Sequence, residues 1–202
     1  MEETEAQGKR YKIIYADPPW PVTFVDDRTA SVKGGWENRQ CGILRDPEYK
    51  TLTIDEIKSL TVQQISDKDC VLYLWVTNKH IEKSYDVARS WGFKPSCLLT
   101  WVKKPMGLGL GGAFCQTTEH ILYCRKGNPL TIKRSDTCWF PFKRQNKHSQ
   151  KPKEFRDIIT SVHGDVPRVE LFARQATPGW DIWGNELENS FEFKEWGKNE
   201  RN

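Results

Sequence analysis

This chain of 202 residues contains no long apolar run and no closely spaced pair of cysteines. No stretch approaches the roughly 20 apolar residues of a membrane-spanning helix, and the polar opening MEETEAQGKR is unlike a secretory signal. The six cysteines are scattered and several lie in apolar runs, which favours buried, reduced thiols over disulfides or a zinc site. We therefore expect a soluble protein of a reducing compartment, with no membrane partner: the cytoplasm, or the nucleus if the source is a eukaryote.

A strong excess of one charge is also missing. The chain has 31 Lys and Arg against 27 Asp and Glu, a formal net charge of +4, which is compatible with a polyanionic partner but does not identify one. Aromatic residues, in contrast, make up 12% and include nine tryptophans, and hydrophobic residues make up 37%. This composition and length are typical of one globular domain with a substantial core.

Helix and strand patterns alternate along the chain. Continuous apolar runs predict strands at 13–16, 70–76, 98–102, 120–124 and 169–173. Helix signals stand between them: a capping box at 53–56, a helix at 78–91 capped by Asn78 and closed by Gly92, and a helix from 153 to about 162 after Pro152. The alternation predicts an α/β fold with a mostly parallel central sheet and helices on both faces.

We expect one domain at 11–187, between a polar N-terminal tail at 1–10 and a polar C-terminal tail at 188–202. Two segments inside the domain, 21–50 and 103–118, are too long for simple connections, and we predict that both are functional loops.

The second of these loops contains a GxGxxG match at Gly107, Gly109 and Gly112. A dinucleotide-binding glycine turn must open a helix, whereas these glycines precede a β-like run. We therefore predict a mobile flap there rather than a dinucleotide site.

The stretch YADPPWP ends the first predicted strand with a carboxylate, two prolines and a tryptophan. Ligands of open α/β sheets bind at the carboxyl ends of the strands, so Asp17 stands where chemistry is expected. Pro18 and Pro19 restrict the backbone, which would hold the Pro18 carbonyl as a second acceptor beside Asp17. Trp20 adds a flat apolar face.

Two fixed acceptors beside an aromatic face suit a planar ring that carries an exocyclic amino group. Accepting hydrogen bonds from both amino hydrogens favours a pyramidal nitrogen, whose lone pair is then free to attack. The aromatic face would hold such a base after it has left its helical stack. The other interpretation of the same residues is a rigid turn with a core tryptophan.

The motif at 17–20 also matches the catalytic motif of the MT-A type adenine-N6 methyltransferases, relatives of the eukaryotic mRNA adenosine methyltransferase. Six further segments resemble that family in the same order: YKTLTIDE at 49–56, LWVT at 74–77, TWVK at 100–103, HSQKP at 148–152, ELFAR at 170–174 and WGNE at 183–186. The ordered set spans about 12–187. It implies a Rossmann-like, S-adenosylmethionine-dependent methyltransferase fold with permuted motif order, and methyl transfer to adenine N6.

The resemblance also implies roles for single residues. The catalytic set would be Asp17, Pro18, Pro19 and Trp20, with Asp17 facing both the target amine and the cofactor's ammonium group. Lys151 would pair with the cofactor's carboxylate at the start of a helix. The other implied cofactor-binding residues are His148, Glu170, Phe172, Arg174, Asn185 and Glu186, the last two at positions that hold the ribose hydroxyls. Transfer is expected to need no metal and no covalent enzyme intermediate.

Two of these positions also have an interpretation without a role in cofactor binding. Without the resemblance, Lys151 would be a solvated surface lysine and Arg174 a member of a structural ion pair.

A basic run, KRQNKH at 143–148, precedes the predicted cofactor lysine. Lys143, Arg144 and Lys147 either follow a phosphate backbone with salt-sensitive affinity or belong to a solvated loop. Trp36 in the first long loop either stacks on a base or anchors its own loop. These four residues are the candidate nucleic-acid contacts.

The compact form is similar to the small microbial and phage-type members of the family, which favours DNA over RNA as the partner. An RNA adenosine-N6 methyltransferase remains an alternative, as does a catalytically inactive nucleic-acid-binding subunit, although such subunits lose the aspartate or tryptophan that this chain keeps. A cytosine-N4 methyltransferase is disfavoured because such enzymes more often carry serine in place of Asp17. A homodimer or a heteromeric partner stays open.

Overall fold

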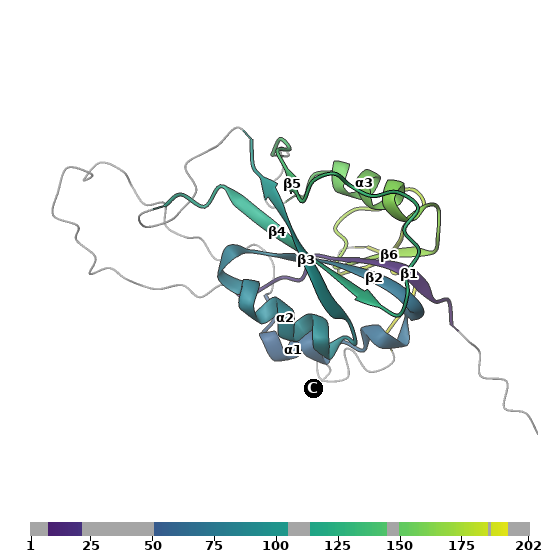
Figure 1. Cartoon of the computed structure of the whole chain (residues 1–202). Helices are drawn as coiled ribbons and strands as arrows, with labels where there is room; N and C mark the ends of the chain where they lie inside the picture. Colours follow the sequence, from purple (N-terminus) through teal and green to yellow (C-terminus); the bar gives the residue numbers. More distant parts are fainter. Residues whose placement is uncertain (1–7, 22–50, 105–113, 145–149, 186, 194–202) are drawn as a thin grey trace, which may run out of the picture.

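The structure, a computed structural model, describes residues 8–21, 51–104, 114–144, 150–185 and 187–193. These residues form seven strands, three α-helices and two 3₁₀ turns (Figure 1). In chain order the elements are β1 (Tyr11–Ala16), α1 (Ile54–Ser59), η1 (Val62–Gln64), β2 (Ser66–Val76), η2 (Asn78–His80), α2 (Ile81–Ser90), β3 (Lys94–Val102), β4 (Thr118–Lys126), β5 (Trp139–Phe140), α3 (Glu154–His163), β6 (Arg168–Leu171) and β7 (Asp181–Trp183).

The seven strands form one sheet in the order β5-β3-β4-β2-β1-β6-β7. β1 pairs in parallel with β2 and β6, and the β6–β7 and β3–β5 pairs are parallel too. Of the described strands, β4 alone runs antiparallel to its neighbours, β2 and β3. The predicted α/β fold with a mostly parallel sheet is confirmed, with β4 as its one reversed strand.

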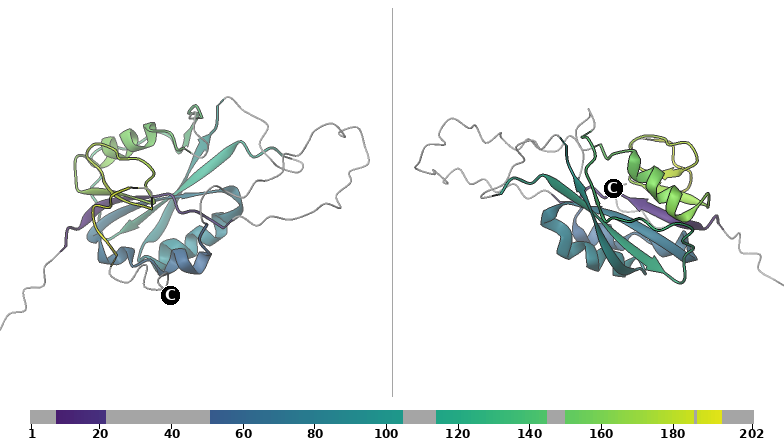
Figure 2. Two further views of the ribbon diagram at one scale, coloured as in Figure 1. Left: turned by 180° about the vertical axis from the view of Figure 1, so that it is seen from behind. Right: turned by 45° about the horizontal axis from the view of Figure 1, so that its top comes forward.

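Helices cover both faces of the sheet, as predicted. α1 and α2 lie on one face and α3 on the other (Figures 1 and 2). Successive side chains of a strand point to opposite faces, so β1 contributes Ile14 and Ala16 to the α1–α2 side and Ile13 and Tyr15 to the α3 side. All four side chains are almost completely buried, which explains why this strand has a continuous apolar sequence.

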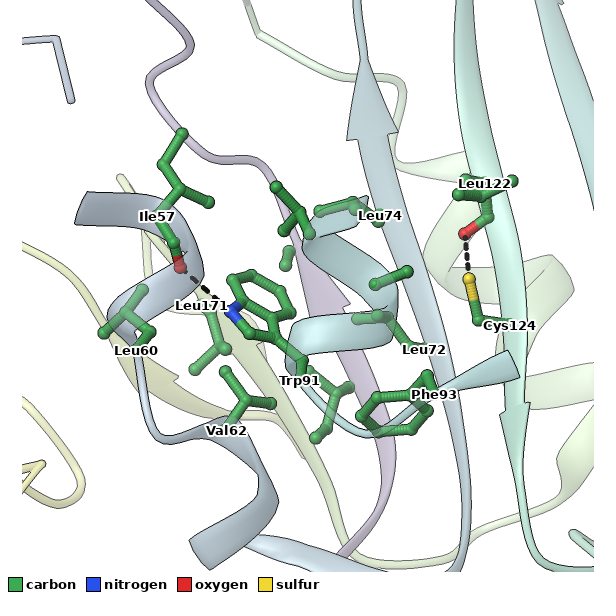
Figure 3. Close-up of a cluster of buried hydrophobic side chains, with 14 of the residues drawn as sticks. Ile57, Leu60, Val62, Leu72, Leu74, Trp91, Phe93, Leu122, Cys124 and Leu171 are labelled. Carbon is green, nitrogen blue, oxygen red and sulfur yellow. Dashed lines mark hydrogen bonds between the residues drawn. The ribbon is translucent and has the colours of Figure 1, made fainter. Parts of the chain in front are cut away.

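The helix ends follow the sequence signals in part. Thr53 and Glu56 form the predicted capping box of α1. At the end of α2, the buried Trp91 donates its Nε1–H to the Ile57 carbonyl of α1 at 2.9 Å (Figure 3). Gly92 follows with φ +82°, and its N–H and that of the next residue return to carbonyls in the last turn of α2. This left-handed glycine ending of the helix was predicted.

The prediction that Asn78 caps the N-terminal end of α2 is wrong. The 3₁₀ turn η2 comes first, and α2 begins only at Ile81. The Asn78 side chain instead donates to the Thr118 carbonyl at 3.1 Å. It therefore connects the end of β2 to the beginning of β4.

Both outer strands of the sheet, β5 and β7, are absent from the predicted set. They have two and three residues, too few for a recognisable apolar pattern.

Parts of both predicted tails contact the domain near β7. Phe193, in the predicted C-terminal tail, is only 4% exposed, and its ring centre lies 5.0 Å from that of Trp183. At the N-terminal side, Lys9 pairs with Asp181 at 2.5 Å.

The cysteines differ from the expectation of buried thiols. Cys70 and Cys124 are buried, but Cys97, Cys115 and Cys138 are exposed, and all five are free. The predicted glycine flap lies outside the described residues. Among the described residues, no helix has the length and apolarity required to cross a membrane.

Candidate active site

Several of the predicted site residues stand at one edge of the sheet, where the parallel strands end. Because β4 runs the other way, it brings its first residues to this same edge. The polar residues collected here are Asp17 after β1, Asn78 after β2, Lys103 after β3, Glu119 and His120 at the start of β4, Lys151 before α3, Arg174 after β6 and Asn185 after β7. This is the edge at which ligands bind in open α/β sheets.

An alternating row of charges crosses the site. Lys103 Nζ lies 2.5 Å from Glu119 Oε1, Glu119 Oε2 lies 3.2 Å from Lys151 Nζ, and Lys151 Nζ lies 3.0 Å from Asp17 Oδ2. The Lys151 ammonium also stands 5.1 Å from the centre of the Trp75 ring. The row joins the ends of β1, β3 and β4 to the start of α3, and the Trp75 contact adds β2, so Lys151 and Asp17 are fixed relative to the sheet.

Burial and charge act against each other on these groups. Burial raises the pKa of Asp17 above its ordinary value, and the nearby Lys151 only partly opposes this. For Glu119, burial would also raise the pKa, but the two lysines outweigh it and the pKa is lowered. Burial would lower the pKa of Lys151, yet Asp17 and Glu119 raise it above its ordinary range, so this side chain stays charged.

The backbone of the motif at 17–20 is held by hydrogen bonds. The Pro18 carbonyl accepts from the Trp20 N–H at 2.8 Å, and the Pro19 carbonyl accepts from the Leu52 N–H at 2.9 Å. A carbonyl oxygen has two lone pairs, so the oriented Pro18 oxygen retains acceptor capacity. Its predicted role as the second acceptor beside Asp17 stays a prediction.

Trp20, which is predicted to offer a flat apolar face, is largely buried, and its role toward a base stays a prediction. The side chain is only 7% exposed, and its Nε1–H donates to the Trp75 carbonyl at 2.8 Å. His80 lies against it, with ring centres 5.6 Å apart and an interplanar angle of 14°. One face of the indole is therefore covered by the protein itself.

His80 is a site residue that the sequence reasoning missed. Its Nε2 lies 2.8 Å from the Pro21 carbonyl, and because a carbonyl only accepts, Nε2 must carry the proton. Burial lowers the pKa of His80, which favours the neutral ring. The imidazole thus holds Trp20 by stacking and Pro21 by a hydrogen bond.

Glu170 lies inside the domain, where it binds Arg156 of α3. Arg156 donates through Nε and Nη2 to the two carboxylate oxygens at 2.8 and 2.6 Å. Both side chains are less than 10% exposed, so the Glu170 carboxylate is already engaged by two charge-assisted hydrogen bonds. The pair attaches α3, and with it the helix start near Lys151, to β6.

The ends of β6 and β7 form the other side of the site. Phe172 has a φ of +62° and is the one described non-glycine residue with a positive φ, a strained conformation that is frequent at functional sites. Arg174 is exposed, and its charge weakly opposes the raising of the Asp17 pKa by burial. The Ala173 N–H donates to the Trp183 carbonyl at 3.0 Å, which places the β6 end beside the exposed Asn185.

Gly184 allows this close approach of the two strand ends. A Cβ atom at this position would collide with the backbone oxygen and nitrogen of Ala173, and the Gly184 N–H is bound by Asn189 Oδ1 at 2.7 Å. The glycine of the predicted WGNE segment therefore has a steric reason.

Part of the predicted nucleic-acid surface is described. Lys143 and Arg144 are exposed. Their backbone lies beside that of Lys104, whose N–H donates to the Phe142 carbonyl at 3.0 Å and whose carbonyl accepts from the Arg144 N–H at 2.8 Å. The predicted residues Trp36, Lys147, His148 and Glu186 lie outside the described residues. Within the described part of the chain, no group of three or more His, Cys, Asp or Glu side chains is placed to hold a metal ion.

Comparison with known proteins decides the family. The MT-A70 family model matches residues 11–186. The chain belongs to the MT-A70 family. This confirms the family expected from the sequence motifs, and with it the methyltransferase class and an α/β fold of that kind.

Several relatives of this MT-A70 chain are named methyltransferases. The chain is 30% identical over 204 residues to the type II methyltransferase M.MunI of Mycoplasma sp, covering 96% of this chain and 85% of that protein. It is 27% identical to an N(6)-adenosine-methyltransferase MT-A70-like protein of Drosophila melanogaster and 26% identical to the human N(6)-adenosine-methyltransferase catalytic subunit METTL3. Each of the latter matches covers 89% of this chain but only 27% and 28% of the longer relative.

Proposed function

We propose that this protein transfers a methyl group from S-adenosylmethionine to the N6 amino group of adenine in nucleic acid, with DNA as the favoured substrate. The observation that carries the proposal is the Asp17–Lys151 pair at the tip of β1, 3.0 Å apart, in a motif that belongs to a methyltransferase family.

The charges at this edge fit the amino-acid end of the proposed cofactor. Such an end carries an ammonium group and a carboxylate, and Asp17 and Lys151 offer one charge of each complementary sign side by side. Their side chains are 28% and 12% exposed, so both are partly screened from water while Asp17 remains accessible. In this proposal Asp17 holds the ammonium group, Lys151 and Arg174 hold the carboxylate, and Asn185 binds the ribose.

When bound, S-adenosylmethionine supplies an electrophilic methyl group on a sulfonium. The residues of this chain would position the adenine amine and shape its electron density. Asp17 and the Pro18 carbonyl would accept its two hydrogens, which favours a pyramidal nitrogen with a directed lone pair. Fixed acceptors contribute to catalysis without the reorganisation that water would need, and the alignment of two bound reactants contributes further.

A general base is not required in this scheme, because the methylated ammonium is acidic enough to lose its proton readily. In this scheme Asp17 accepts as a carboxylate, a form that burial opposes and the contact with Lys151 favours. Lys143 and Arg144, with Lys147 and Trp36 from segments that the structure does not describe, are the proposed nucleic-acid contacts.

DNA is favoured over RNA because of the extent of the matches. The chain covers 85% of M.MunI, named a type II methyltransferase, against 27% to 28% of the relatives named N(6)-adenosine-methyltransferases. RNA is the second candidate substrate, since those relatives align with nearly all of this chain. The intact 17–20 motif supports an enzyme rather than an inactive subunit.

The test is transfer of a radiolabelled methyl group from S-adenosylmethionine to DNA and RNA oligonucleotides of matched sequence, followed by mass analysis of the nucleosides. We expect N6-methyladenine in DNA. The Asp17→Ala variant should lose transfer while unfolding at a similar temperature to the wild type. Full activity of Asp17→Ala, or label on cytosine, would contradict the proposal.

A further inference from the structure

One tryptophan of the described structure stands apart from the others. Six of the seven described tryptophans are at most 9% exposed, whereas Trp139 on β5 is 57% exposed. Tryptophan contributes a large apolar area to a core or an interface, so an exposed indole on a regular strand indicates an interaction site more strongly than an exposed aliphatic side chain does.

The position of Trp139 follows from the alternation along β5. Its neighbour Phe140 is buried in the cluster on the α3 side, so Trp139 points to the opposite face of the sheet. On that face α2 packs on β2, β3 and β4. β5 is the last strand of the sheet on its side, and no ring partner of Trp139 is found among the described residues.

Exposed cations follow Trp139 along the same edge. β3 and β5 pair at Thr100–Trp139 and Trp101–Phe140, and an isolated bridge between Lys104 and Lys143 follows beyond both strands. The edge therefore leads from Trp139 toward the exposed side chains of Lys104, Lys143 and Arg144. Over residues 133–144 the chain carries four basic side chains and only one acidic side chain, Asp136. The surface is therefore aromatic and positively charged.

We propose that this edge, formed by Trp139, Lys104, Lys143 and Arg144, binds unpaired nucleotides that flank the target base. Trp139 stacks on a base, and the three cations face the phosphates. The inference rests on the proposed function, which makes nucleic acid the substrate, and it adds the state of the flanking strand. A surface indole beside a basic groove is the arrangement by which proteins hold single strands.

The indole distinguishes single strands from duplexes. In a duplex each base is already stacked between its neighbours, so an external ring has no free base face to contact. The cations, in contrast, meet phosphates in either form. Removing Trp139 should therefore weaken single-strand binding selectively, while removing the cations should weaken both.

The experiment measures binding of a fluorescein-labelled 20-mer DNA, as a single strand and as the matched duplex, by fluorescence anisotropy over a range of salt concentrations. The variants are Trp139→Ala, Trp139→Phe, which retains a smaller ring, and Lys143→Gln/Arg144→Gln. Ile132→Ala is the matched control, because Ile132 is 61% exposed and lies outside the proposed surface.

We expect Trp139→Ala to weaken single-strand binding about tenfold and duplex binding less than twofold, with Trp139→Phe in between and Ile132→Ala unchanged. The double charge variant should reduce the slope of log affinity against log salt by about 0.7 per lost charge on single strands. Wild-type affinity of Trp139→Ala, or equal weakening on both forms, would overturn the inference. So would a wild-type dimer that Trp139→Ala converts to a monomer, since the edge would then be an interface between copies.

The two proposals fail separately. If the wild type methylates DNA but Trp139→Ala binds and methylates like it, only the inference about this edge is wrong. If oligonucleotide binding depends on Trp139 but no methyl transfer occurs, the inference about this edge holds and the proposed enzyme activity is wrong.

Discussion

Lys151 has two carboxylate partners in this structure, Asp17 at 3.0 Å and Glu119 at 3.2 Å. A lysine that served only to neutralise Asp17 would not need the second one. Glu119 is in turn bound by Lys103 at 2.5 Å, so the Lys151 ammonium is held from the sheet side whatever Asp17 contacts. Lys151 can therefore keep its place when Asp17 engages an amine.

The Lys151→Met variant tests this arrangement, because methionine keeps the length of the side chain and removes the charge. Without the ammonium, burial raises the pKa of Asp17 unopposed by its main partner. We expect the affinity for S-adenosylmethionine to fall about 10- to 100-fold, since charge-assisted bonds are lost. Any remaining methyl transfer should need a higher pH, because Asp17 must be ionised. Calorimetric titration and a pH–rate profile measure these effects.

Lys153→Met is the matched control for that variant. Lys153 is two residues away and exposed, so its replacement should change neither the affinity nor the profile. A Lys151→Met protein with wild-type cofactor affinity would remove Lys151 from the proposed site.

His80 can be tested by separating its two contacts with Trp20 and Pro21. His80→Phe keeps a ring against Trp20 but loses the hydrogen bond, His80→Gln keeps a donor but loses the stacking, and His80→Ala loses both. Because His80 acts through the motif at 17–20, we expect kcat for methyl transfer to fall, about tenfold or more in His80→Ala, with a small change of KM for the cofactor. The two partial variants should lie between.

A purely structural role of His80 would lower the unfolding temperature of these variants without changing kcat of the folded protein. Lys83→Gln provides the control, since Lys83 is exposed on the following helix. Equal kcat in His80→Ala and the wild type would contradict the positioning role.

At the scale of elements, the Arg156–Glu170 pair connects α3 to β6. Removing one member of a buried pair leaves the other charge without a partner, which costs about 3–5 kcal/mol. We expect Arg156→Met to lower the free energy of unfolding by an amount in this range, measured by urea denaturation. The double variant Arg156→Met/Glu170→Met should recover a large part of the loss, because it leaves no buried charge. A loss below about 1 kcal/mol in the single variant would show that the pair is unimportant for stability.

The elements of this fold were predictable to different degrees. The central strands could be recognised because burial on both faces gives them unbroken apolar sequences, and the capping box and Gly92 marked two helix ends through local backbone chemistry. The direction of β4 could not be recognised, since an apolar run looks the same in a parallel and an antiparallel strand. The two shortest strands were missed because they are held by their neighbours in the sheet rather than by their own sequence.

The residues of the site were also predictable from the sequence to different degrees. Asp17 and Lys151 belong to local motifs, so they could be singled out from the sequence; the structure shows that they lie 3.0 Å apart, and their roles stay predictions. Glu119 and His80 stand in no such motif: one reaches the site only because β4 is reversed, and the other because η2 turns it onto Trp20. The Glu119–His120 dipeptide directly before an apolar strand was the available signal for the first of these. Glu170 was assigned to the cofactor by resemblance, and its contact with Arg156 depends on where α3 packs.

At the scale of the whole molecule, the three described histidines make stability depend on pH. Burial lowers the pKa of His80, His120 and His163 below the ordinary value of 6.5. At a pH between the lowered values and 6.5, the unfolded chain therefore binds more protons than the folded protein. The contribution of these neutral histidines to stability is present above about pH 6.5 and is lost as the pH falls toward their lowered pKa values. Asp17 and Glu170, whose pKa values are raised, act with the opposite sign.

A His163 variant separates these contributions. His163 is 2% exposed; its Nδ1–H donates to the Leu130 carbonyl at 2.6 Å, and its Nε2 accepts from the Tyr73 hydroxyl at 2.8 Å. We expect His163→Gln to be less stable at pH 7.5 and to lose less stability than the wild type on acidification to pH 5.5. The slope of the free energy of unfolding against pH should be smaller in the variant than in the wild type, by at most about 1.4 kcal/mol per pH unit. Parallel curves for the two proteins in urea unfolding would exclude the titration of His163 as a cause.

The reversal of β4 also connects folding accuracy to the chemistry of the site. Glu119 faces Lys103 and Lys151 on one side of the sheet, and the adjacent His120 contacts Thr100 and Asn78 on the other. If β4 paired one residue out of step, the two side chains would exchange sides, and an imidazole would meet the lysines. A chain misassembled in this way would lack the Glu119 contact that holds Lys151 from the sheet side, so we expect the specific activity of a preparation to fall as the fraction of such molecules rises.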